Sequence, residues 1–312
     1  MDHHESKEKA NLKPTVNSSE LLAIYEGLRD LFPAASFPVQ FQRQDDLSQL
    51  SQRFDAFFFD AFGVLNIGET AIEGAVERVA TLRQQGRHLR VVSNAGGTPK
   101  QGLVDKYSRL GFDFSADEII CSRDALNYYL KKEPPGYWGA IAPPGAPTDD
   151  LRGEFINLAE RPEAVDEVDG IVLLSTIDYD HSLTERLIAS LTARPRIVLL
   201  GNPDLAAPRE DHFSLEPGYV AQQLIKAVNM PLHAFGKPYK SVFQLALDSL
   251  PEDIYPDQVL MVGDTLHTDI LGGRFAGLET ALVVGQGFSS TLDWQQAIQE
   301  TGLVPHYVID HI

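Results

Sequence analysis

Short apolar runs followed by helical segments recur along this chain and constrain its fold more than any other feature. In the first part of the chain, apolar runs at residues 56–59 and 88–92 are each followed by a helical pattern, at residues 72–85 and 100–110. Gly86 and Gly111 come directly after the two helical patterns, where glycine is typical of a helix end. Such alternation predicts a parallel sheet with helices on both faces.

The same alternation returns late in the chain, after an interruption in the middle. The late strands are predicted at residues 232–235, 258–262 and 280–284, with helices at residues 239–250 and 269–276. The interruption alternates too, with strands predicted at residues 137–141, 171–174 and 197–200 and helices at residues 183–193 and 219–228. We therefore expect an α/β protein with a doubly wound, Rossmann-like parallel-sheet core and an inserted, smaller α/β cap domain.

Three regions follow from this pattern. We predict an N-terminal tail and helix in residues 1–50, a core domain in residues 51–121 and 231–312, and the inserted cap in residues 122–230. The N-terminal helix is expected at residues 17–32, where Asn17 and Glu20 form a capping-box pattern. It is a candidate for covering a sheet edge or for joining copies of the chain into a homo-oligomer.

Charge and cysteine content narrow the classes of partner. The 312 residues include 26 Lys and Arg against 44 Asp and Glu, a formal net charge of −18. This balance argues against nucleic acid or an anionic membrane as a partner, because phosphate backbones are bound by clustered cations. Cys121 is the only cysteine, which indicates a reducing compartment. No apolar run approaches about 18 residues, so we expect a cytoplasmic protein.

Polar residues follow four of the predicted strands, at the carboxyl ends where the ligand crevice of such a sheet lies. They are Asp60, Ser93 with Asn94, Lys237, and Asp264 with Asp269. Each taken alone is a common turn or cap residue. Together they supply a nucleophile, a hydroxyl with neighbouring amides, a cation and an acidic pair.

These residue types suit phosphoryl transfer through an aspartyl intermediate. Attack by Asp60 on phosphorus gives an acyl phosphate, which water then cleaves. The charge on the transferred group calls for hydrogen-bond donors and a cation, which Ser93, the amides of residues 94–97 and Lys237 can provide. Asp264 and Asp269 offer the hard oxygen ligands that Mg²⁺ prefers.

The four loops resemble the four motifs of the haloacid dehalogenase (HAD) superfamily, over residues 57–287. The interval between Asp60 and Ser93 is short and the interval before Lys237 is long, which resembles class IIA, the branch of NagD-like and 4-nitrophenylphosphatase-like sugar and nucleotide phosphatases. The segment Asn202-Pro203-Asp204 is similar to one found in that branch.

The resemblance implies a role for each matching residue. Asp60 and Lys237 would be catalytic; Ser93, Asn94, Ala95, Asn202 and Asp204 would bind the substrate or its phosphate; Asp60, the backbone carbonyl of Phe62, Asp264 and Asp269 would bind Mg²⁺. The implied activity is hydrolysis of phosphoric monoesters, and the implied partner is a small phosphorylated metabolite. His267, inside the fourth motif, is expected to be a solvated loop residue.

Phe62 departs from the phosphatase pattern. The position two residues after the nucleophile usually holds a second aspartate, which protonates the leaving oxygen and later activates water. Losing a general acid typically costs about 10²–10⁴-fold in rate. Three hypotheses therefore stay open: a Mg²⁺-dependent phosphohydrolase of weak or atypical activity, a dehalogenase-like or phosphonatase-like hydrolase, and a non-catalytic protein that binds a phosphorylated metabolite.

Overall fold

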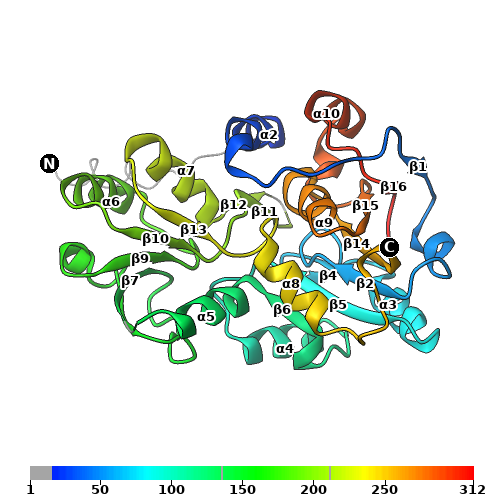
Figure 1. Ribbon diagram of the computed structural model, residues 1–312, viewed down its shortest axis with the longest axis horizontal. Coiled ribbons are helices and arrows are strands. Elements are labelled where there is room, and N and C mark those ends of the chain that lie inside the picture. The colour runs from blue at the N-terminus through cyan, green and yellow to red at the C-terminus, as the bar shows by residue number, and fades with distance from the viewer. Residues whose placement is uncertain (1–15, 135, 211) are drawn as a thin grey trace, which may run out of the picture.

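Two parallel β-sheets lie side by side along the long axis of the protein (Figure 1). The computed structural model describes residues 16–134, 136–210 and 212–312, so the predicted tail at residues 1–15 lies outside the described residues. Within the described residues, the larger sheet has seven strands in the order β1-β16-β15-β14-β2-β5-β6, and the smaller has five in the order β13-β10-β9-β7-β8.

The larger sheet contains strands from both halves of the chain. Its strands are β1 (Gln42–Arg43), β2 (Ala56–Phe59), β5 (His88–Ser93), β6 (Ile119–Cys121), β14 (Val259–Gly263), β15 (Glu279–Val283) and β16 (Tyr307–Ile309). The helices that follow or flank these strands are α3 (Ala75–Gln84), α4 (Lys100–Arg109), α5 (Ser122–Lys132), α8 (Lys240–Asp248), α9 (Leu271–Phe275) and α10 (Trp294–Thr301). The predicted doubly wound α/β fold is confirmed.

Burial on both faces of β2 explains the run of phenylalanines. Phe57 and Phe59 pack into the core on one face of the sheet, whereas Phe58 packs into a second core on the other. A central strand covered by helices on both sides needs apolar side chains in both directions. Asp60, the next residue, therefore lies at the carboxyl end of a central strand whose register is strongly specified.

The smaller sheet is built from the middle of the chain. Its strands are β7 (Tyr137–Ile141), β8 (Glu154–Asn157), β9 (Gly170–Leu173), β10 (Ile197–Leu200) and β13 (Leu232–Ala234), and its helices are α6 (Ser182–Ala193) and α7 (Pro217–Ala227). One strand differs from expectation: residues 232–234 pair with β10 and not with the larger sheet. Apolar periodicity predicted the strand, but it does not specify which of two parallel sheets the strand joins. The domain boundaries stay a prediction.

Two short hairpins and one helix lie between the sheets. The hairpins are β3–β4 (Asn66–Ile67 and Thr70–Ala71) and β11–β12 (Ala206–Pro208 and Phe213–Leu215). The helix is α2 (Ser18–Gly27), which has the predicted capping box between Asn17 and Glu20. Leu21 and Tyr25 of α2 pack against Leu205, next to the β11–β12 hairpin, and against Phe288. No helix in the described part of the chain is long and apolar enough to cross a membrane.

Candidate active site

The loops after β2, β13 and β14 meet at one buried lysine. Nζ of Lys237 lies 2.5 Å from Oδ1 of Asp60 and 2.7 Å from Oδ1 of Asp269. Asp60 is held in place by its own backbone, which donates to the carbonyl of Val262 in β14 at 2.9 Å. Burial opposes a charge on Lys237, but Asp269 and Asp60 outweigh it and raise the pKa of Lys237 above its ordinary value.

Three carboxylates form a cluster that fits a divalent cation. Asp60, Asp264 and Asp269 each offer one oxygen, and these oxygens all lie within 4.8 Å of one another. Burial, followed by the charge of Asp60, raises the pKa of Asp264 and raises that of Asp269 to about 7. The single positive charge of Lys237 does not neutralise the charge of three carboxylates that lie this close together. Hard oxygen donors with excess negative charge are the environment that suits Mg²⁺.

A cavity of about 160 Å³ opens above Asp60. Eight of the residues predicted for the site line it: Asp60, Phe62, Ser93, Asn94, Ala95, Asn202, Asp204 and Asp264. Lys237 and Asp269, the other two, are buried and contact each other, and Lys237 also contacts Asp60. The structure thus brings all of the predicted site residues together from both sheets. The metal-binding role of the Phe62 carbonyl stays a prediction.

Comparisons with known proteins agree with this geometry. Residues 57–145 match a family model for haloacid dehalogenase-like hydrolases, and residues 234–312 match a second HAD-hydrolase-like model. Chronophin from Mus musculus is 30% identical over 265 residues, which cover 81% of this chain and 89% of the relative. The chain belongs to the haloacid dehalogenase-like hydrolases.

Two further comparisons support the class IIA assignment of this HAD-like hydrolase. An acid sugar phosphatase from Staphylococcus aureus is 26% identical over 263 residues, covering 82% of this chain and 94% of the relative. A crystal structure from Cytophaga hutchinsonii, described as a possible sugar phosphatase, superposes with a TM-score of 0.72 at 29% identity and covers 87% of this chain and 98% of the other.

Two glycines of the HAD-like hydrolase make room for the carboxylate of Asp264. A Cβ added to Gly63 would lie 1.9 Å from Oδ2 of Asp264, and one added to Gly287 would lie 2.0 Å from the same atom. Gly63 also has φ +82, a conformation that side chains other than glycine disfavour. The Asp264 carboxylate accepts hydrogen bonds from the Phe288 amide at 2.6 Å and the Thr265 hydroxyl at 2.8 Å.

Three of the predicted substrate-binding residues are linked by hydrogen bonds. Asn94 accepts a hydrogen bond from the Lys237 amide at 2.7 Å and donates to the Lys237 carbonyl at 3.1 Å and to Asp204 at 2.8 Å. Asn202 accepts from the Asp204 amide at 2.9 Å and donates to Glu216 at 3.1 Å. These contacts give Asn94, Asn202 and Asp204 a positioning role in this structure, and their binding of substrate stays a prediction.

Burial raises the pKa of Asp204 to about 8. Lys237 opposes this shift, while the nearby Asp60 carboxylate adds to it. Asp204 lies at the wall of the cavity, and its raised pKa favours the protonated form there more than at an exposed position.

Sequence reasoning missed two cations beside Phe62. Nζ of Lys106 lies 4.2 Å from the centroid of the Phe62 ring, and the guanidinium carbon of Arg209 lies 4.7 Å from it. A signal existed for Lys106, which follows Leu103 by three positions and so shares the helix face of α4 that is buried against the site. Arg209 follows the short strand β11, and no pattern in the sequence marked it.

His267 is not the solvated loop residue that the sequence predicted. It lies in a π-helical turn (η7, Leu266–Ile270) and is fully buried. Its ring stacks on Tyr25 at 4.9 Å, and Nε2 lies 2.6 Å from Oε1 of Glu26. The expectation failed because a helix distant in sequence, α2, covers this turn.

Proposed function

We propose that this chain hydrolyses small phosphate monoesters through a phosphorylated Asp60. The proposal is supported chiefly by the position of Lys237, whose ammonium contacts both the Asp60 carboxylate and the acidic cluster. Several relatives are named as phosphatases, among them the acid sugar phosphatase from Staphylococcus aureus. A sugar or nucleotide phosphate is the substrate class that we propose.

The residues divide the chemistry among them. Oδ1 of Asp60 contacts Lys237 and accepts from the Ala61 amide at 2.6 Å, so we assign the attack on phosphorus to Oδ2. The attack forms an oxygen–phosphorus bond to Asp60 and breaks the bond to the leaving alcohol, which takes up a proton from water. Water then cleaves the acyl phosphate and regenerates the carboxylate.

Other groups stabilise charge in both steps. Lys237 and the loop that begins at Ser93 neutralise or donate to the oxygens of the phosphoryl group. Asp60, Asp264 and Asp269 are the residues that would hold Mg²⁺, which when bound supplies further positive charge at those oxygens. Phe62 cannot give the leaving alcohol its proton, so activated aryl or acyl phosphates should be the better substrates.

A metal-dependence assay on a panel of esters tests the proposal. We expect phosphate release from 4-nitrophenyl phosphate and acetyl phosphate that needs Mg²⁺, stops with a chelator, and is abolished in Asp60→Asn. Asp257→Asn removes an exposed carboxylate that precedes β14, at the opposite end of that strand from Asp264, and serves as the control for loss of charge. Absence of turnover across the whole panel would overturn the proposal.

The remaining hypotheses predict different outcomes in the same assay. Tight binding of a phosphorylated metabolite without turnover would favour the non-catalytic protein, for which the missing acid at Phe62 is the motivation. Cleavage of a carbon–halogen bond that survives the chelator would favour a dehalogenase-like enzyme. The clustering of Asp60, Asp264 and Asp269 supports the metal-dependent reaction over that alternative.

A further inference from the structure

Two cations lie against the ring of Phe62, at the position where related phosphatases usually have an aspartate. The ring lines the cavity above Asp60, and Lys106 and Arg209 line the same cavity. The Lys106 ammonium lies 4.2 Å from the centroid of the ring, and the guanidinium carbon of Arg209 lies 4.7 Å from it. Two positive charges are thus placed beside the nucleophile in a protein whose net charge is −18.

Lys106 is only weakly neutralised by its partner. Its ammonium lies 3.6 Å from Glu69, whose side chain is 69% exposed, whereas the side chain of Lys106 is 13% exposed. An ion pair with a solvated carboxylate contributes little and holds its partner loosely. The ammonium therefore keeps most of its capacity to bind an anion inside the cavity.

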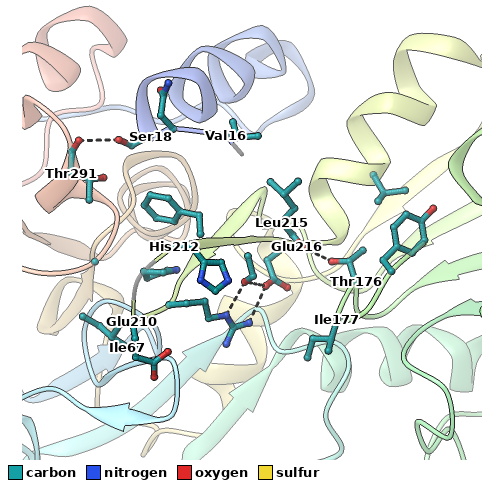
Figure 2. Close-up of a pocket in the computed structure, with 18 of the residues that line it drawn as sticks. Val16, Ser18, Ile67, Thr176, Ile177, Glu210, His212, Leu215, Glu216 and Thr291 are labelled. Atoms are coloured by element: carbon teal, nitrogen blue, oxygen red, sulfur yellow. Dashed lines mark hydrogen bonds and ion pairs between the residues drawn. The ribbon is translucent and has the colours of Figure 1, made fainter. Parts of the chain in front are cut away.

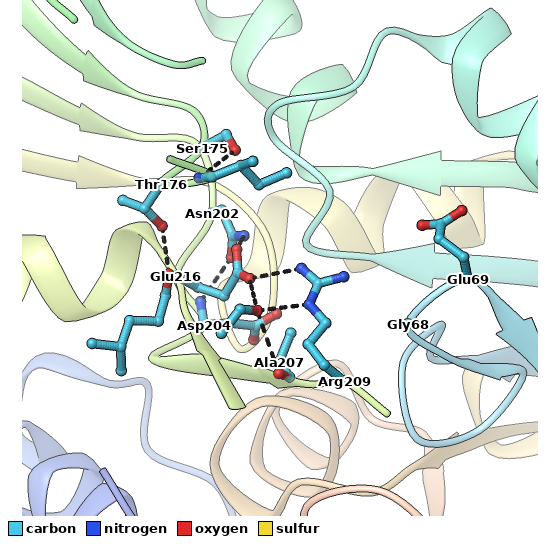
Figure 3. A network of polar contacts seen from close by, with 12 residues as sticks. Gly68, Glu69, Ser175, Thr176, Asn202, Asp204, Ala207, Arg209 and Glu216 are labelled. Carbon is cyan, nitrogen blue, oxygen red and sulfur yellow. Dashed lines mark hydrogen bonds and ion pairs between the residues drawn. The ribbon is translucent and has the colours of Figure 1, made fainter. Parts of the chain in front are cut away.

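Arg209 is fixed in orientation by the cap. Its Nε donates to Ser214 at 2.9 Å, and its Nη2 lies 3.3 Å from Glu216. Figure 3 shows Glu216 on one side of the guanidinium, with Gly68 and Glu69 of the β3–β4 hairpin across from it. The guanidinium is held at the place where the cap hairpin meets the core hairpin, facing the ring of Phe62.

Arg209 also borders a second, larger cavity of about 1050 Å³. Figure 2 shows this cavity between Ser18 and Thr291 on one side and Thr176 and Ile177 of the cap on the other. Ile177, Arg209 and Glu216 belong to both cavities, so the small phosphate cavity and the larger one share a wall. A substrate reaching out of the small cavity would pass the Arg209 guanidinium.

We propose that Lys106 and Arg209 bind a second anionic group of the substrate, a carboxylate or a second phosphate on the leaving alcohol. The inference rests on the proposed function and names its substrate class. Lys237 and the Mg²⁺ that Asp60, Asp264 and Asp269 would hold already serve the reacting phosphate, so the two further cations in the same cavity are available to a second anionic group. An aspartate at position 62 would pair with these cations, whereas the neutral ring of Phe62 does not compete with the substrate for them.

Three esters of similar size test the inference. Glycerol 3-phosphate has no second anion, 3-phosphoglycerate adds a carboxylate, and propane-1,3-diol bisphosphate adds a phosphate. Because hydrogen bonds between charged groups are stronger than those between neutral groups, we expect kcat/KM for 3-phosphoglycerate, the bisphosphate or both to exceed that for glycerol 3-phosphate by about tenfold or more. The ester that is preferred identifies the second group as carboxylate or phosphate.

Matched variants assign the preference to the two cations. Lys106→Met and Arg209→Met should each remove most of the preference, while Arg109→Met, an exposed cation of the same helix α4, should keep it. Thermal unfolding verifies that each variant is folded, and Lys106→Gln and Arg209→Gln replace any methionine variant that is not. Equal kcat/KM for the three esters, or a preference unchanged in both variants, would overturn the inference.

Failure of the proposed function can be told apart from failure of this inference. If the wild-type protein releases phosphate from 4-nitrophenyl phosphate or acetyl phosphate but from none of the three esters, the proposed function stands; if it releases phosphate from none of these compounds, the proposed function fails. In either case, calorimetric titration with the three esters then tests the cation pair alone. Tighter binding of 3-phosphoglycerate or the bisphosphate than of glycerol 3-phosphate would support the inference. Equal affinity for all three would overturn it.

Discussion

The ring of Tyr25 stacks on the ring of His267, with centroids 4.9 Å apart and planes only 8° from parallel. This contact joins the N-terminal helix α2 to the π-helical turn that carries Asp269. The Tyr25 hydroxyl also accepts a hydrogen bond from the Leu205 amide at 3.0 Å, next to Asp204 of the cap. One side chain outside the four motifs therefore contacts segments on both sides of the candidate site.

Tyr25→Phe should destabilise the protein although it keeps the ring. Removing the hydroxyl leaves the buried Leu205 amide without its partner, which typically costs about 1–3 kcal/mol in the free energy of unfolding. Urea-induced unfolding measures the change. Tyr128→Phe removes a hydroxyl from a tyrosine that is 54% exposed and should change the midpoint much less. An equal change in the unfolding midpoint of the two variants would show that the hydrogen bond to Leu205 does not stabilise the protein.

Gly63→Ala and Gly74→Ala form a matched pair of variants that tests the proposed Mg²⁺ site. Both glycines have nearly the same backbone, φ +82 and φ +81, so alanine costs a similar conformational strain at each. Only at Gly63 does the new Cβ meet the Asp264 carboxylate, while nothing lies within 4 Å of it at Gly74. We expect the apparent Mg²⁺ affinity to fall about 10–100-fold in Gly63→Ala, as for loss of a supporting contact to a metal ligand. Mg²⁺ titration of activity measures it, and an equal loss in Gly74→Ala would contradict the steric explanation.

Phe62→Asp should raise activity toward alkyl phosphates relative to aryl phosphates. The new carboxylic acid can protonate a poor leaving group, and such a general acid typically contributes about 10²–10⁴-fold. Lys106 and Arg209 would favour its ionised form, so the gain should be largest toward acidic pH. The measurement is the ratio of kcat/KM for the two classes of ester. Phe62→Asn has a similar shape without the acid, and a comparable gain in that variant would exclude acid catalysis as the cause.

Asp204 should make the metal-free protein less stable as the pH rises. Its pKa is raised from 3.8 to about 8, so between these values the folded state keeps a proton that the unfolded state has lost. The stabilisation is complete below the unfolded pKa and is lost as the pH approaches the folded pKa. Asp204→Asn should flatten the decline in the thermal unfolding midpoint across this window, measured with a chelator present. Asp105→Asn, at an exposed position of α4, should keep the decline; identical slopes in all three proteins would rule out Asp204 as its source.

Much of the fold could be predicted from the sequence, because local patterns determine most of the helices and strands. Strands β2, β7 and β10 begin and end where apolar runs predicted them, and Gly86 and Gly111 have the positive φ expected after a helix. Edge strands such as β1, with only two residues, have too few positions to show a periodicity. The pairing of β13 with β10 depends on contacts between distant segments, which no local pattern records.

The residues of the candidate site likewise fall into those that could be predicted from the sequence and those that could not. Residues fixed by the end of a strand, such as Asp60 and Asp264, could be placed from sequence because parallel strands bring their carboxyl ends to one edge. Residues that reach the site from a helix face or a hairpin, such as Lys106 and Arg209, depend on how the two sheets pack together. The same limit explains His267, whose burial is due to α2.

The three hydrogen bonds of the Asn94 side chain have a consequence for protein engineering. This core residue binds both the backbone of Lys237 and the carboxylate of Asp204 in the cap. Close by, a side chain at Gly96 would collide with the Gly201 carbonyl of the cap, only 2.3 Å away. The cap is therefore not an interchangeable module: a chimaera carrying a cap from another enzyme would also have to reproduce the partners of Asn94 and the space beside Gly96, or it would misplace Lys237.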